Sequence, residues 1–189
     1  MLVYIIIFGL LSMINGASFL LDNEGWSIVG NKDTAAAIHK PYSLVPMSNY
    51  ILGTDNLVNV DSVNKDDRNL WYFRSPPIKL TKQPEIMVFT ITSFSGDFAR
   101  LNQGAPVVRI IDSEGRVAAF YKAVFDGNMQ TITVPFFEEL WTSNDDVSFK
   151  KLFQNLFIVE TLGDWTRGVE TVAIDNVEFY WVYNLCKNQ

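Results

Sequence analysis

Short segments rich in β-branched residues, separated by turn residues, constrain most strongly what this chain can fold into. They occupy positions 85–92, 107–111, 117–121 and 129–134, and Gly- and Asp-containing clusters lie between them. Segments of this length and composition are typical of strands, and the clusters favour tight turns. Several short strands at this spacing predict an all-β fold, either an antiparallel sandwich or a barrel.

The segment 66–80, DDRNLWYFRSPPIKL, is expected to organise the core. Four bulky apolar residues at 70–73 precede a Pro-Pro pair at 76–77, and proline cannot donate a hydrogen bond to a neighbouring strand. Proline also biases the residue before it toward extended backbone, so strand pairing should stop at 74–75. We therefore predict a buried strand with Trp71 at its centre.

Further strands are predicted at 26–29, 156–162 and 172–183. By contrast, the segment 42–61, which contains Pro46 and a Gly-Thr-Asp-Asn turn, is predicted to be irregular.

Helical signal is confined to one region. Pro135 can serve as the first helical position for a segment over 136–141, and Asp145 or Asp146 can cap a second segment. The apolar residues of that second segment follow the i, i+3, i+4, i+7 spacing of a helix face: Phe149, Leu152, Phe153 and Leu156. The complete prediction is an antiparallel β-sandwich with one or two short helices.

The last predicted strand contains a change of parity. Val172 and Ile174 share one side of the strand, whereas the apolar residues at 177, 179 and 181 share the other. One extra residue at Asp175-Asn176 would bring both sets onto the same face, so we predict a β-bulge there.

The composition excludes several partners. The chain is 48% hydrophobic and 14% aromatic, which is typical of one folded domain, and its formal charge is -6. A nucleic acid or an anionic membrane would be repelled by this charge, and the Lys and Arg residues are scattered singly. We therefore predict no nucleic-acid partner.

The N-terminus has the layout of a secretory signal peptide. An apolar run at 2–11 is followed by Gly16 and Ala17, so residues 1–17 are predicted to be removed and 18–189 to form the secreted, extracellular domain. The apolar run is too short to span a bilayer, so no stable membrane insertion is expected after cleavage; an uncleaved anchor is the alternative. Cys186, the single cysteine, cannot form an internal disulfide.

Several motifs together resemble the laminin IV type A domain, also called the laminin B domain. They are Glu24-Gly25-Trp26, Gly53-Thr54-Asp55, Leu70-Trp71-Tyr72-Phe73 with Ser75-Pro76, the segment from Glu138 to Trp141, and Ile174-Asp175-Asn176-Val177. The resemblance covers nearly all of 18–189 and implies a galactose-binding-like jelly roll. In that family the domain is a globular insert among EGF-like modules of extracellular matrix proteins, but this chain has no EGF-like cysteines.

The resemblance implies a secreted, non-enzymatic binding or structural module with an extracellular glycan or glycoprotein as its partner. The alternative is a secreted carbohydrate-active enzyme or its accessory domain. The family brings no catalytic residues, and His39, the single histidine, is interpreted as a surface residue in a turn-rich segment. The acidic pairs at 138–139 and 145–146 are adjacent in sequence, so on a helix they would point to different sides; solvated faces or caps are favoured over a catalytic pair.

A calcium ion is the one cofactor that the resemblance implies. Galactose-binding-like jelly rolls often hold Ca²⁺ with an acid from the first strand and the Asp of the last, which here are Asp22 or Glu24 with Asp175. Calcium takes six to eight oxygens, so turn carbonyls would have to complete the shell. The alternative is that Asp175 merely bonds the backbone at its bulge.

Trp165 is the predicted ligand-contacting aromatic. It lies with Arg167 in a polar loop, where an indole has less reason to be buried, whereas the other tryptophans lie inside apolar runs and are predicted to be core residues: Trp26, Trp71, Trp141 and Trp181.

Overall fold

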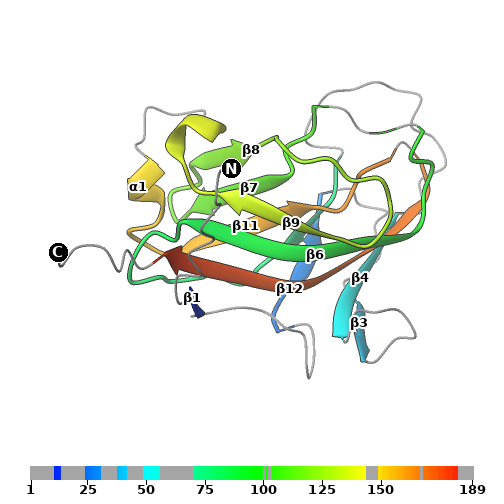
Figure 1. The fold of residues 1–189 in the computed structure, drawn as a ribbon, viewed down its shortest axis with the longest axis horizontal. Coiled ribbons are helices and arrows are strands. Elements are labelled where there is room, and N and C mark those ends of the chain that lie inside the picture. The colour runs from blue at the N-terminus through cyan, green and yellow to red at the C-terminus, as the bar shows by residue number, and fades with distance from the viewer. Residues whose placement is uncertain are drawn as a thin grey trace, which may run out of the picture.

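The fold is a sandwich of two antiparallel sheets (Figure 1). The computed structural model describes residues 11–13, 24–30, 38–41, 49–55, 70–99, 101, 104–143, 149–166 and 168–182. The first sheet has the order β3-β4-β12-β6-β9. Strand β1 pairs with the C-terminal part of β12, on the same edge of β12 as β4. The strands of this sheet are β1 (Leu11–Met13), β3 (Ile38–Pro41), β4 (Asn49–Asp55), β6 (Ile86–Ser95), β9 (Gln130–Pro135) and β12 (Glu170–Val182).

The second sheet has the order β10-β8-β7-β11-β5-β2. Its strands are β2 (Ser27–Val29), β5 (Tyr72–Arg74), β7 (Val108–Asp112), β8 (Val117–Phe120), β10 (Trp141–Ser143) and β11 (Phe157–Leu162). A 3-10 turn, η2 (Glu138–Leu140), and one α-helical turn, α1 (Phe149–Leu152), lie together at one end of the sandwich (Figure 1). The prediction of an antiparallel β-sandwich with short helices is confirmed.

The predicted burial of the segment around Trp71 is also confirmed, but its strand is short and begins one residue after Trp71. Trp71, Tyr72 and Phe73 are fully buried, and β5 ends at Arg74, just before the prolines. The Trp71 ring lies so close to two glycines of neighbouring segments, Gly53 and Gly163, that neither position has room for a side chain. The first part of the segment, residues 66–69, lies outside the described residues.

The central strand of the first sheet is β12. It is 13 residues long and pairs with β4, β6 and β1. Its register against β6 shifts between Asp175 and Glu178, and Asn176 has a φ of 50°, so the predicted bulge is confirmed. The bulge allows the apolar residues before and after it to be buried in the same core.

Two sequence expectations are wrong. The segment predicted to be irregular contains β4, whose Ile51 is fully buried, because pairing with β12 overrides the weak local signal. His39 lies in the adjoining strand β3, not in a turn.

Both predicted helical segments contain helical turns, but these are shorter than predicted. Pro135 ends strand β9 instead of beginning a helix, and only residues 138–140 form a turn there. The second helix stops at Leu152, so Leu156 leaves the predicted apolar face and is 47% exposed. The expected caps, Asp145 and Asp146, lie outside the described residues.

Apart from β1, the predicted signal segment 1–17 lies outside the described residues, as does Cys186. No helix in the part of the chain that the structure describes is long and apolar enough to cross a bilayer.

Candidate functional site

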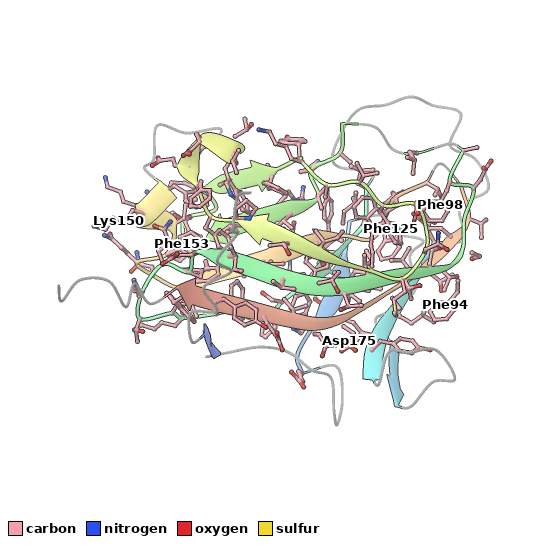
Figure 2. The ribbon with its side chains drawn as sticks, in the orientation of Figure 1. Phe94, Phe98, Phe125, Lys150, Phe153 and Asp175 are labelled. Carbon is pink, nitrogen blue, oxygen red and sulfur yellow. The ribbon has the colours of Figure 1, made fainter. Side chains whose placement is uncertain are left out.

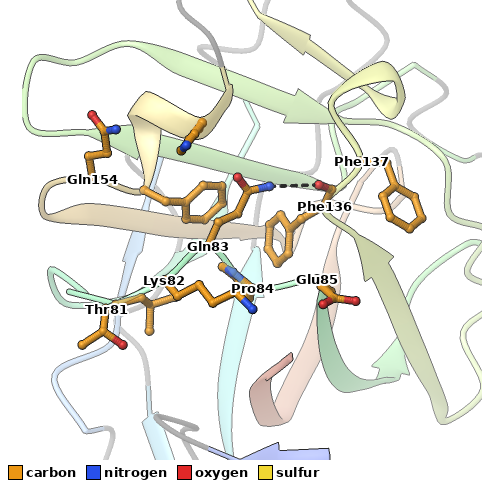
Figure 3. A pocket seen from close by; sticks show the side chains of 11 residues that line it. Thr81, Lys82, Gln83, Pro84, Glu85, Phe136, Phe137 and Gln154 are labelled. Carbon is orange, nitrogen blue, oxygen red and sulfur yellow. Dashed lines mark hydrogen bonds between the residues drawn. The ribbon is translucent and has the colours of Figure 1, made fainter. Parts of the chain in front are cut away.

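A pocket of about 680 Å³ opens at the end of the sandwich that carries α1 (Figure 3). It is formed by the segment that enters β6, the residues that follow β9, and the region of α1. Its lining consists of Leu80, Thr81, Lys82, Gln83, Pro84, Glu85, Phe136, Phe137, Lys150, Phe153 and Gln154.

The pocket has an apolar floor that belongs to the core. Phe136 and Phe153 are each 3% exposed, and their rings meet edge to face with centroids 5.2 Å apart. Phe136 also stacks on Trp141 at 5.4 Å, and the indole Nε1–H of Trp141 donates to the Pro135 carbonyl at 2.9 Å. Because these rings are held by core packing, the floor is rigid.

Phe137 differs from Phe136 because the alternation of β9 continues past the strand. Ile132, Val134 and Phe136 point inward and are buried, so Phe137 points outward and is 53% exposed. Figure 3 shows its ring on one side of the pocket and Gln154 on the other. An exposed phenyl ring presents an apolar surface that a ligand can cover.

The polar side of the pocket is fixed by backbone contacts. The Trp181 indole donates to the Lys82 carbonyl at 3.3 Å, and the Gln83 side-chain amide donates to the Phe136 carbonyl at 3.2 Å. The Glu85 N–H donates to the Tyr180 carbonyl at 2.9 Å, and the Glu85 carbonyl accepts from the Phe136 N–H at 2.8 Å. The segment 82–85 is therefore anchored to β12 and to the end of β9.

This pocket was not predicted from the sequence. Its one local signal is the Phe136-Phe137 pair directly after a strand with clean alternation, which predicts that one of the two rings is exposed. The remaining polar residues come from segments far apart in the sequence, so no motif could have grouped them.

The predicted exposure of Trp165 is wrong. Its side chain is 6% exposed, its ring meets Phe125 at 5.0 Å, and its indole Nε1–H donates to the Leu162 carbonyl at 2.8 Å. The loop turns inward because the N–H groups of Gly163 and Asp164 both donate to the Trp71 carbonyl. The other four tryptophans are buried, as predicted, and Arg167 lies outside the described residues.

Asp175 is buried on β12 at the bulge (Figure 2). One oxygen of its carboxylate accepts the Asn176 N–H at 2.7 Å, and the other accepts the Asn176 side-chain amide at 3.1 Å. Burial raises the pKa of Asp175 to about 6, and the carboxylates of Glu178 and Glu24 act in the same direction. The side chains of Glu24 and Asp175 are therefore close enough to interact electrostatically.

The expected calcium site stays a prediction. Asp22 lies outside the described residues, and no group of three or more acidic, His or Cys side chains within the described ranges could hold a metal ion. Of the three predicted ligands, the structure describes Glu24 and Asp175, and calcium would require further oxygens beside them. The alternative, a backbone bond at the bulge, is observed in the Asn176 contact.

A second acidic cluster was not foreseen from the sequence. Glu170 is fully buried, and its carboxyl accepts the Thr166 N–H at 3.1 Å and the Thr166 hydroxyl at 3.2 Å. Burial and the neighbouring carboxyl of Asp164, to which it hydrogen-bonds, raise the pKa of Glu170. Asp55, also buried, lies opposite Glu170 in the pairing of β4 with β12. Two carboxyl groups can share a hydrogen bond only if one is protonated, so the Asp164–Glu170 pair holds one proton at neutral pH.

The acidic pair at Glu138-Glu139 has a structural role in part. The Glu138 carboxylate accepts the Phe149 N–H at 3.0 Å and so satisfies a donor at the start of α1.

The sequence matches no family model and no curated protein. Among solved structures, the L4b domain of human laminin alpha-2 covers 90% of this chain and 98% of its own, with 12% identity and a TM-score of 0.59. A family 11 carbohydrate-binding module from Clostridium thermocellum, in complex with a β-1,3-1,4-mixed-linked tetrasaccharide, covers 91% and 96%, with 13% identity and a TM-score of 0.54. An exo-β-agarase matches 89% of this chain over 25% of its own, with 12% identity and a TM-score of 0.58.

Similarities at this level of identity show the fold. They confirm, for the fold, the resemblance that the motifs predicted: the chain has a laminin-type, galactose-binding-like jelly roll.

Proposed function

We propose that this protein is a non-catalytic module that binds extracellular glycans or glycoproteins through the pocket beside α1. The observation that carries the proposal is the exposed ring of Phe137 in one pocket with amide, ammonium and carboxylate side chains. A pyranose offers an apolar face and a ring of hydroxyl groups, so it requires this combination of a flat ring and polar partners. The fold that this chain shares with a carbohydrate-binding module supports the same function.

The lining also favours binding over hydrolysis. Two-carboxylate hydrolysis needs a facing pair of acids, and Glu85 is the single carboxylate among the described residues that line the pocket. The Asp164–Glu170 pair is buried and shielded from solvent, so it cannot contact a polymer.

The test is a glycan array followed by titration calorimetry with the saccharide that binds. Phe137→Ala should weaken binding by up to about tenfold, because aromatic contacts contribute about 0.5–1.5 kcal/mol beyond burial. Phe94→Ala is the matched control, since Phe94 is 45% exposed and lies at the opposite end of the sandwich from Lys150 and Phe153 (Figure 2). The proposal would be overturned if both variants lost the same affinity, or if the wild type bound no glycan either on the array or in solution.

The second candidate is an accessory domain of a carbohydrate-active enzyme, which the match to a quarter of an exo-β-agarase chain favours. An accessory domain binds without cleaving, so incubation of the protein with its bound saccharide should release no reducing ends. If the wild type released reducing ends and the Glu85→Gln variant did not, the pocket would instead be catalytic.

Secretion is part of the proposal. N-terminal sequencing of the exported protein should begin at Ala17 or Ser18, and an intact Met1 in a membrane fraction would contradict it.

A further inference from the structure

The pocket carries two lysines that come from different elements. Lys82 lies in the segment before β6 and Lys150 lies in α1, and both side chains are exposed. Neither forms an ion pair with another residue of the part of the chain that the structure describes. Their ammonium groups are therefore open to a negatively charged group of a ligand.

The local charge of the pocket is opposite to that of the whole chain. Lys82 and Lys150 against Glu85 leave a lining with one positive charge, whereas the chain has a formal charge of -6. Glu138 lies next in sequence to Phe137, but it is not part of the lining and its carboxylate accepts the Phe149 N–H. A cationic recess on an acidic protein attracts an anion locally while the rest of the surface repels polyanions.

We propose that the pocket selects a saccharide that carries a carboxylate or sulfate group over its neutral counterpart. The inference rests on the proposed function and names the class of its ligand. The apolar face of the sugar ring covers Phe137, the anionic group is held by Lys82 and Lys150, and the ring hydroxyls bond Gln154 and Glu85.

The anchoring of the segment around Lys82 supports this selection. Its carbonyl is held by the Trp181 indole, and the next residue, Gln83, is bonded to the Phe136 carbonyl. The backbone at Lys82 is thus fixed before the ligand arrives, which lowers the entropy lost on binding.

The experiment is titration calorimetry with three probes: an oligogalacturonate, its methyl ester, and a sulfated galactan oligosaccharide of the same length. The wild type should bind at least one anionic probe about tenfold more tightly than the ester, because each of the two exposed ion pairs contributes about threefold. This preference should shrink at high salt, because salt screens exposed charges.

The double variant Lys82→Gln/Lys150→Gln should bind anionic and neutral probes alike. Its matched control is Lys122→Gln/Lys151→Gln, which removes the same charge from two exposed lysines outside the pocket; Lys151 is the direct neighbour of Lys150 in α1. The control should keep the wild-type preference.

Two outcomes would overturn the inference: the wild type binds neither anionic probe more tightly than the ester, or the control variant loses the preference to the same extent as the pocket variant. If the ester binds as well as the acid and both need Phe137, the proposed function stands and only the selection fails. If no probe and no neutral glycan binds, the proposed function fails with it.

Discussion

The ring of Trp71 covers Gly163 so closely that a Cβ placed on this glycine would lie 2.0 Å from the indole. The backbone confirms the contact, since the Gly163 N–H donates to the Trp71 carbonyl at 3.0 Å. Trp71, which directly precedes β5, and the loop after β11 are therefore fitted to each other, and the loop carries Trp165 and Asp164 into the interior.

Trp71→Ala should destabilise the fold by about 3–5 kcal/mol, the typical cost of truncating a fully buried aromatic residue. Gly163→Ala should also destabilise it, because the added methyl displaces the ring. In the Trp71→Ala background, however, Gly163→Ala should cost much less, since the ring is gone. Urea unfolding of the two single variants and the double variant measures this coupling, and additive free energies would contradict the contact.

Glu170→Gln should flatten the dependence of stability on pH. The pKa of Glu170 is raised to about 10, chiefly by burial and by Asp164, so between about pH 5 and pH 9 the folded state holds a proton that the unfolded state releases. Stability conferred by this group is therefore present at low pH and lost as pH rises toward 10, by up to about 1.4 kcal/mol per pH unit.

Denaturant unfolding at pH 5, 7 and 9 should show the wild type weakening relative to Glu170→Gln as pH rises. Asp126→Asn is the control, because Asn128 lowers the pKa of this exposed aspartate, which titrates below this range. Parallel profiles for the wild type and Glu170→Gln would show that Glu170 is ionised in the folded protein.

If Asp175 binds calcium, the ion should raise the unfolding temperature, and this shift should depend on Asp175. A bound ion would stabilise the folded state by about 2.7 kcal/mol at a hundredfold excess over its dissociation constant. The shift should be larger at pH 7.5 than at pH 5, because the pKa of Asp175 is raised to about 6 by burial and the ion requires the carboxylate form.

Thermal unfolding of the wild type and Asp175→Asn, each with calcium and with a chelator, measures this shift. Asp175→Asn keeps the shape of the side chain and should abolish the shift, while Glu178→Gln tests whether any neighbouring charge has the same effect. A wild type that calcium leaves unshifted would confine Asp175 to its role at the bulge.

Asn176→Val should destabilise the protein by about 1–2 kcal/mol more than Asn176→Gly. Both variants lose the side-chain bond to Asp175, but Asn176 has a φ of 50°, a left-handed conformation that glycine adopts readily and a β-branched residue resists. Thermal unfolding of the two variants gives the difference, and equal stability would mean that the bulge has relaxed.

Local sequence patterns predicted the burial of the segment around Trp71, the bulge at Asp175 and the all-β class. These features follow from local patterns, namely period-two burial, a parity change and prolines that end pairing, and such patterns act wherever the chain folds. The same alternation also contained the signal for Phe137, although the proposed role of that ring depends on its neighbours.

Four features depend on contacts between distant segments: the strand β4, the burial of Trp165, the pKa of Glu170, and the pocket. The β4 strand gains its stability from pairing with β12, and Trp165 turns inward because its loop bonds Trp71. The carboxyl of Glu170 changes its pKa because the fold buries it beside Asp164, and the pocket joins residues from 80 to 154. Each of these depends on groups that are distant in sequence and adjacent in space, and burial and pairing energies of that kind leave no local pattern to detect.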